Sequence, residues 1–131
     1  MKKVMFVCQK NSRRSQMAEG FARTLGKEKI AVTSAGLETE QVDPMAVQVM
    51  SEIGIDISKQ TSKPLSNFHP QEYDVVISLC GCGVNLPAVW LTTEVFEDWQ
   101  IEDPQGKSIE TFRQIRDQIK ERVVKLIASL S

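Results

Sequence analysis

The sequence lacks the features that direct proteins to membranes, nucleic acids or the secretory route. Its 131 residues carry a formal net charge of −1, so no strong field favours nucleic acid or an anionic surface. No apolar run approaches the roughly 20 residues of a membrane span, and no signal peptide precedes the first predicted strand. We therefore expect a cytoplasmic monomer with a single domain over residues 1–131, which binds neither nucleic acid nor membranes.

Cysteine and histidine are scarce as well: the chain has Cys8, Cys80, Cys82 and His69. Structural disulfides are rare in the cytoplasm, so these cysteines indicate reactive thiols rather than a disulfide framework. Cys80 and Cys82 have no further Cys or nearby His to complete a zinc site, so we predict no metal. Gly81 between them permits a strained, easily reduced disulfide. The alternative is two ordinary cysteines at the end of a strand.

The most informative segment is residues 8–15, Cys-Gln-Lys-Asn-Ser-Arg-Arg-Ser, which directly follows the apolar residues 4–7. Backbone N–H groups in a loop between a strand and a helix can surround a tetrahedral oxyanion. Arg14 can add a planar, two-pronged donor to the same anion. This positive environment favours the thiolate of Cys8. The loop is therefore predicted to bind a phosphate-like anion beside a nucleophile, whereas the alternative is a buried, structural cysteine.

Polar side chains in and beneath this loop are expected to support the anion site. Asn11 tolerates a left-handed backbone, and Ser12 and Ser15 can donate to the thiolate or the anion. Glu19 and Ser34 are expected beneath the loop, although Glu19 could equally be a solvated helix residue. The residues expected to bind the anion are Gln9, Lys10, Asn11, Ser12, Arg13 and Arg14.

Apolar and amphipathic segments alternate along the chain. Strands are predicted at residues 3–8, 30–34, 74–79 and 94–99. Helices are predicted at residues 16–25, from 43–44 to 54, at 67–72, and from about 108 to 130. This pattern predicts an α/β three-layer sandwich, in which helices cover both faces of a four-stranded parallel sheet of flavodoxin-like order.

Ligands in such folds bind at the carboxyl ends of the strands. The loop after Cys8, the loop at residues 80–82 and the loop after Trp99 are all expected at that edge. Asp103, which precedes Pro104 in the last of these loops, could lie over the anion and protonate a leaving oxygen. Taken alone, Asp-Pro indicates only a turn.

Together these motifs resemble the arsenate reductases built on the low-molecular-weight tyrosine phosphatase fold, and the resemblance covers essentially the whole chain. The close spacing of Cys80 and Cys82 is most similar to the cyanobacterial branch, which is linked to glutathione and glutaredoxin. The thioredoxin-linked branch has its last two cysteines further apart. The matching segments are residues 8–20, Ser34-Ala35-Gly36, Gly54-Ile55-Asp56, Asp74-Val75-Val76 and residues 98–104.

The resemblance implies a role for each reactive residue. It implies that Cys8 is the nucleophile, that Arg14 binds the anion and that Ser15 supports the thiolate. It also implies that Asp103 is the general acid, with Cys80 and Cys82 as redox cysteines. The implied reaction reduces arsenate to arsenite through a thiol–disulfide relay. Glutathione with glutaredoxin, or thioredoxin, regenerates the thiols, and no tightly bound cofactor is expected.

The sequence departs from the family pattern at two positions. Some relatives bind potassium beside the loop, using residues that match Asn11, Glu19 and Ser34 plus an aspartate. Lys63 stands at the aspartate position here, and its ammonium could replace the ion, so we predict no potassium site. Arg13 stands where many relatives carry a small residue or Cys, and it is expected to add positive charge near the mouth of the loop.

Two other functions stay open from the sequence. A phosphatase of this fold would use the same loop to hydrolyse phosphate monoesters through phosphocysteine. Such phosphatases usually carry aromatic residues after the Asp-Pro pair, where this chain has Gln105-Gly106. A protein of another class would bind oxyanions or sense redox state without turnover.

Overall fold

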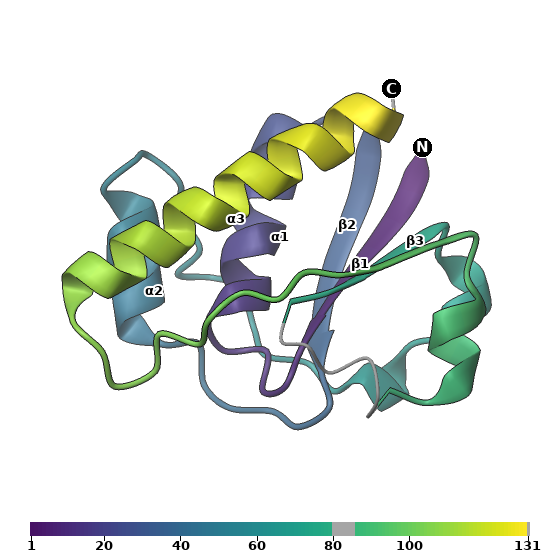
Figure 1. The fold of residues 1–131 in the computed structure, drawn as a ribbon, viewed down its shortest axis with the longest axis horizontal. Coiled ribbons are helices and arrows are strands. Elements are labelled where there is room, and N and C mark those ends of the chain that lie inside the picture. The colour runs from purple at the N-terminus through teal and green to yellow at the C-terminus, as the bar shows by residue number, and fades with distance from the viewer. Residues whose placement is uncertain (80–85, 131) are drawn as a thin grey trace.

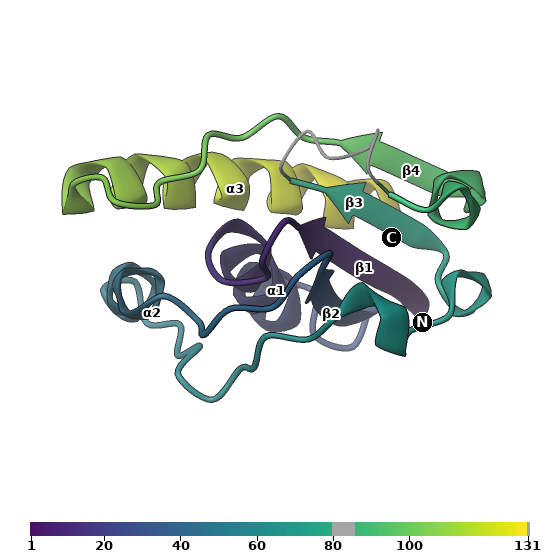
Figure 2. The same cartoon turned by 90° about the horizontal axis from the view of Figure 1, so that it is seen from below.

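The computed structural model describes residues 1–79 and 86–130. In these residues, four strands form one parallel sheet in the order β2-β1-β3-β4 (Figures 1 and 2). Val4 lies at the centre of the sheet, where it pairs with Val32 on one side and Val75 on the other. The predicted fold class and strand order are confirmed. The strands are β1 (Lys2–Cys8), β2 (Ile30–Gly36), β3 (Val75–Ser78) and β4 (Val95–Asp98).

In the described part of the chain, three α-helices cover one face of the sheet: α1 (Arg14–Leu25), α2 (Pro44–Ser51) and α3 (Ile109–Leu130). Figure 1 shows α3 lying across α1 and α2, and it contacts both. Alternate residues of the strands face this helical layer, as expected for strands buried on both sides. The larger core cluster includes Val4, Phe6, Met17, Phe21, Met50, Ile77, Phe112 and Ile119.

Short 3-10 helices cover the other face of the sheet, rather than the α-helices that the pattern suggested. Met5 and Val76 point to this side, where they join the cluster that includes Leu65 and Trp90. These covering residues belong to η1 (Leu65–Asn67) and η4 (Ala88–Thr92). The third layer of the sandwich is therefore present but thin. Helix η4 is not expected from the sequence, since five residues are too few to show a helical period.

Proline explains two of the observed boundaries. The single short helix expected at residues 67–72 is instead η1 followed by η2 (Pro70–Glu72). A helix cannot run through this segment, because Pro70 lacks an N–H group and keeps the exposed His69 extended. Helix α2 starts at Pro44 as predicted, and the Asp43 carboxylate caps it by accepting from Met45 N at 2.9 Å.

The carboxyl edge of the sheet brings together two of the predicted site loops, the loop after Cys8 and the loop after Trp99. The loop after Cys8 leads directly into α1, which begins at Arg14, two residues earlier than expected. The predicted Cys80-Gly81-Cys82 loop lies outside the described residues. Across residues 1–79 and 86–130, every helix is too short or too polar to cross a lipid bilayer.

Candidate active site

The loop after β1 encloses a small cavity beside the Cys8 thiol. Cys8 is buried, and the cavity has a volume of about 30 Å³. Within the described residues, no backbone N–H group of residues 9–15 donates to a protein acceptor. These donors and the small volume suit a compact anion rather than an extended organic ligand. The lining residues are Cys8, Gln9, Lys10, Ser12, Arg13, Arg14 and Asp103.

Gly36 allows the loop to pack closely against β2. A Cβ atom at this position would lie 2.8 Å from Asn11 N and 2.9 Å from the carbonyl carbon of Lys10. Both are backbone atoms of the loop at residues 9–13 (the anion loop), and the backbone oxygen of Glu38 is nearer still, so any side chain here would displace the backbone on both sides. This explains why a glycine ends β2 beside the end of β1, where Gly36 pairs with Cys8.

The Arg14 guanidinium is fixed on one side and open on the other. Its NH1 group donates to Ile101 O at 2.8 Å and to Leu79 O at 3.3 Å. Its Nε is buried without a hydrogen-bond partner among the described residues, and its NH2 lies 3.6 Å from Asp103 Oδ2. A buried, unpaired donor on a permanently charged group is costly unless a ligand fills it. The Nε–NH2 edge therefore presents two donors to an oxyanion.

A buried polar network holds the loop from beneath. Asn11 adopts the left-handed backbone expected of it, with φ 53°. Its Nδ2 group donates to Ser15 Oγ at 2.8 Å and to Ser34 Oγ at 2.9 Å. Ser15 thus accepts from Asn11, so its own hydroxyl proton stays available for a thiolate. Ser34 Oγ donates to Glu19 Oε1 at 2.5 Å, so the buried Glu19 supports the loop rather than lying in solvent.

Lys63 places its ammonium beside this network. Its Nζ lies 3.6 Å from Glu19 Oε1 and donates to Thr61 O at 2.7 Å. Arg23 NH2 lies 2.6 Å from the other oxygen of Glu19. The buried carboxylate is therefore balanced by two cations of the chain itself. Among the described residues, no group of three or more His, Cys, Asp and Glu side chains could hold a metal ion.

Asp103 lies at the mouth of the cavity, and its side chain is 36% exposed. Its Oδ1 accepts from Gln105 N at 3.1 Å, which is the turn contact typical of an Asp-Pro segment. The same oxygen accepts from Arg13 Nε at 3.0 Å. The carboxyl group therefore both forms the turn and lines the cavity beside Cys8.

Comparison with known proteins places the chain in a family. The family described as "Low molecular weight phosphotyrosine protein phosphatase" matches residues 3–131. The chain belongs to this family. It is 67% identical, over the full length of both chains, to the "Glutaredoxin arsenate reductase" of Synechocystis sp.. It is also 43% identical to the arsenate reductase of Staphylococcus aureus (strain Newman) over 121 residues, 91% of each chain.

Solved structures agree with this placement. "An arsenate reductase in the phosphate binding state" has a TM-score of 0.95 and 67% identity, with full coverage of both chains. "An arsenate reductase in oxidized state" has a TM-score of 0.96 and 66% identity, also with full coverage. The resemblance of the sequence to arsenate reductases of the low-molecular-weight phosphatase fold is thus confirmed.

In this member of the phosphatase family, several loop side chains bind to residues 38–41. Gln9 Nε2 donates to Glu38 Oε2 at 2.9 Å, and Lys10 Nζ lies 3.7 Å from Glu40 Oε2. Ser12 Oγ donates to Gln41 O at 2.7 Å, rather than to the thiolate or the anion as expected. The side chains of these residues bind the loop to residues 38–41. Their backbone N–H groups, rather than their side chains, are therefore the donors available to an anion.

Arg13 likewise does not add free charge at the mouth. Its side chain is 6% exposed and contacts the carboxylates of Asp103, Asp43 and Glu40. Burial lowers the pKa of Arg13, but the ion pairs with Asp103, Asp43 and Glu40 outweigh it and raise this pKa above the ordinary value. The sequence places Asp43 only at the start of a predicted helix, since nothing local connects it to Arg13.

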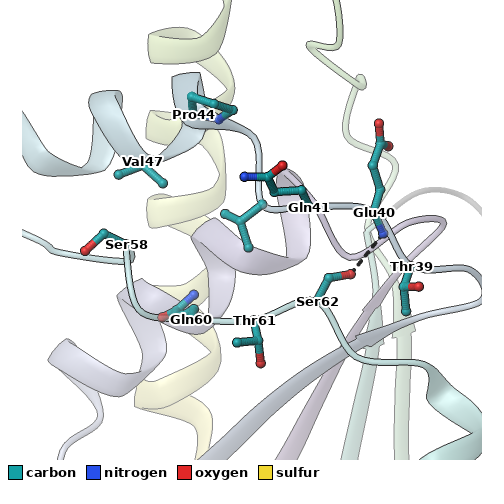
Figure 3. A pocket seen from close by; sticks show the side chains of 10 residues that line it. Thr39, Glu40, Gln41, Pro44, Val47, Ser58, Gln60, Thr61 and Ser62 are labelled. Carbon is teal, nitrogen blue, oxygen red and sulfur yellow. Dashed lines mark hydrogen bonds between the residues drawn. The ribbon is translucent and has the colours of Figure 1, made fainter.

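A larger cavity of about 710 Å³ lies behind the loop, between residues 39–47 and 58–62 (Figure 3). Cys8 does not line it. Ser62 Oγ accepts from Glu40 N at 3.2 Å and donates to Lys10 O at 3.0 Å, so the wall of this cavity supports the anion loop. Gln60 and Gln16 add a second support, because Gln60 Nε2 donates to Gln16 Oε1 at 2.8 Å. These supports are contacts between residues far apart in the sequence, so no local pattern predicts them.

Proposed function

We propose that this chain reduces arsenate to arsenite, with Cys8 as the nucleophile. The observation that carries the proposal is its 67% full-length identity to a glutaredoxin arsenate reductase. The site supports it, because the buried Cys8 thiol shares a small cavity with the open edge of Arg14 and with loop N–H groups that have no acceptor in the described part of the chain. These donors match the oxygens of a tetrahedral anion.

In the first step, Arg14 and the loop N–H groups hold arsenate against Cys8. The Cys8 thiolate forms a bond to arsenic while one arsenic–oxygen bond breaks. Asp103 donates a proton to the departing oxygen, which leaves as water. Ser15 donates a hydrogen bond from its hydroxyl group to the thiolate before attack and keeps its proton. Arsenic keeps its +5 oxidation state in this step, so no electrons have yet been transferred.

The second step reduces the arsenic. A second thiolate, from Cys80 or from glutathione, attacks the sulfur of Cys8 and forms a disulfide with it. The sulfur–arsenic bond breaks, and its electron pair stays on arsenic, which leaves as arsenite. If Cys80 is the attacking thiol, Cys82 then attacks Cys80, which frees Cys8 and leaves a Cys80–Cys82 disulfide. Two external thiols reduce this bond and supply the two electrons of the overall reaction.

The partners follow from this chemistry. We propose that glutathione with glutaredoxin delivers the electrons, in line with the name of the Synechocystis relative, and that thioredoxin is the alternative. The protein would act as a cytoplasmic monomer with a single domain and without a tightly bound cofactor. Reduced external thiols are abundant in that compartment.

Hydrolysis of phosphate monoesters is a second candidate, favoured by the description of the family itself. It would use Cys8, Arg14 and Asp103 but neither of the other cysteines. Gln105 and Gly106 follow Pro104 and are exposed, so this segment presents no aromatic side chain to a phenolic ester. We therefore expect phosphatase activity to be weak.

The deciding experiment is a multiple-turnover assay of arsenite formation. Reduced protein is mixed with arsenate and either glutathione with glutaredoxin or thioredoxin with its reductase. We expect many equivalents of arsenite per chain with glutaredoxin and none for the Cys8→Ser control. No more than one equivalent under both conditions would contradict the proposal and favour a module that binds or senses without turnover.

A further inference from the structure

The Arg13 guanidinium is surrounded by carboxylates from two loops. Its Nε donates to Asp103 Oδ1 at 3.0 Å, and its NH1 donates to Asp43 Oδ2 at 3.2 Å. Its NH2 lies 3.6 Å from Glu40 Oε2, and NH1 also donates to Ser12 Oγ at 3.3 Å. Because the side chain is only 6% exposed, water competes little for these charged contacts. All three nitrogens of the guanidinium therefore face acidic or hydroxyl groups.

Arg13 makes the shorter of the two side-chain contacts between Asp103 and the anion loop. Among the described residues, the hydrogen bonds and ion pairs of the Asp103 side chain outside its own turn are with Arg13 and Arg14. The Arg14 contact is long, at 3.6 Å, and uses the edge that an oxyanion would occupy. The Arg13 contact, at 3.0 Å, does not involve that edge. It can therefore hold the carboxyl group in place both before and after an anion binds.

The segment at residues 40–43 fixes Arg13 from the opposite side. Asp43 is itself held, because its other oxygen caps α2 through Met45 N at 2.9 Å. Glu40 also lies 3.7 Å from Lys10 Nζ, within the same group of charges. A side chain anchored in this way has one orientation, so its Nε is aimed at Asp103 rather than sampling several rotamers.

We propose that Arg13 is a positioning residue for Asp103 and a charge shield for the anion. This inference rests on the proposed function and extends it to a residue outside the reacting groups. The planar guanidinium orients the carboxyl group that protonates the leaving oxygen. Its positive charge offsets Asp103, Asp43 and Glu40, which would otherwise repel a dianionic substrate at the mouth of the cavity.

Two substitutions separate these roles. Arg13→Gln removes both the positive charge and the planar set of guanidinium donors, whereas Arg13→Lys keeps the charge but loses that planar set of donors. We expect Arg13→Gln to raise KM for arsenate roughly tenfold through lost charge, and to lower kcat by ~10–10²-fold through a misplaced acid. Arg13→Lys should restore KM but not kcat. Arg113→Gln is the matched control, because Arg113 is an exposed arginine paired with Glu52, and its kinetics should equal wild type.

A double-mutant cycle tests whether Arg13 acts through Asp103. In the Arg13→Gln background, Asp103→Asn should slow turnover far less than it does in the wild-type background, because the acid is already out of place. If Arg13 were only structural, the two effects would multiply. Thermal unfolding accompanies each variant, and if Arg13→Gln does not fold, the KM and kcat of Arg13→Lys decide the question.

A binding measurement separates this inference from the proposed function. Inorganic phosphate should protect Cys8 from iodoacetamide, and protection should need roughly tenfold more phosphate in Arg13→Gln but not in Arg13→Lys. If wild type makes no arsenite yet shows this pattern, the proposed function fails and the charge shield stands. A multiplicative cycle would refute the positioning role, and phosphate protection in Arg13→Gln equal to that in Arg113→Gln would refute the charge shield.

Discussion

Replacement of Arg14 by lysine should remove most of the activity, because one ammonium cannot do both tasks of the guanidinium. Arg14 anchors itself on Ile101 O and Leu79 O through NH1 and keeps its Nε–NH2 edge open. A lysine that satisfies the carbonyl oxygens loses the anion, and one that binds the anion leaves buried carbonyls unpaired. A lost charge-assisted hydrogen bond costs about 1.5–3 kcal/mol, and an unpaired buried group costs about 1–3 kcal/mol.

Together these costs predict that kcat/KM for arsenate falls on the order of 10²–10⁴-fold in Arg14→Lys. The assay is the initial rate of arsenite formation at limiting arsenate, with phosphate protection of Cys8 measured in parallel. Arg113→Lys is the matched control, because Arg113 makes a two-pronged contact with Glu52 in an exposed place. It should change kcat/KM less than about twofold. Near-wild-type kcat/KM for Arg14→Lys would refute the two-pronged role of Arg14.

Three further predictions address the acid, the loop and the acid stability of the fold. Asp103→Asn should slow formation of the Cys8 adduct on the order of 10²–10⁴-fold in single-turnover experiments; unchanged rates would leave Asp103 as a turn residue. Gly36→Ala should weaken phosphate protection of Cys8, because its Cβ would press on Asn11 N and the carbonyl carbon of Lys10; unchanged protection would contradict this packing. The hydrogen bond from Arg113 lowers the pKa of Glu52 in the folded protein below its ordinary value of 4.5. The ionised Glu52 therefore stabilises the fold above about pH 4.5, and this stabilisation is lost as the pH falls through the lowered pKa of the folded state. Glu52→Gln should therefore flatten the dependence of Tm on pH in this acid range, and an unchanged slope would contradict it.

The segment around Cys8 was predictable because its information is local. An apolar strand, a polar loop and a helical pattern follow one another, and β1 and α1 lie within two residues of the predicted boundaries. The parallel order of the strands follows from the alternation of strands and helices. The left-handed backbone at Asn11 could also be predicted, since it depends on the residue type in a tight loop.

The environment of Arg13 could not be predicted in the same way. Its partners Asp43 and Asp103 lie 30 and 90 residues away along the chain. No periodicity or local motif predicts which carboxylates will surround a given arginine. The sequence therefore suggests that Arg13 carries an unpaired positive charge, whereas the structure shows this charge neutralised by carboxylates. The amide pair of Gln16 and Gln60 beneath the loop is hidden for the same reason, being separated by 44 residues.

The covering of the second sheet face shows a different limit. Trp90 and Leu65 bury this face from short 3-10 helices, η4 and η1. Elements of three to five residues carry no measurable period, and their position depends on the surface that they cover. The thin third layer is therefore a consequence of packing rather than of a local sequence signal.

The central claim is that Cys8 reacts with arsenate and that a thiol relay through Cys80 and Cys82 then reduces it to arsenite. One measurement tests this claim most directly. Fully reduced protein is treated with arsenate in the absence of other thiols, arsenite is quantified, and disulfides are mapped by mass spectrometry. The account predicts one arsenite per chain with a Cys80–Cys82 disulfide, and a trapped Cys8–Cys80 disulfide in Cys82→Ser. No arsenite with all three thiols still reduced, or normal arsenate reduction by both Cys80→Ser and Cys82→Ser, would contradict it.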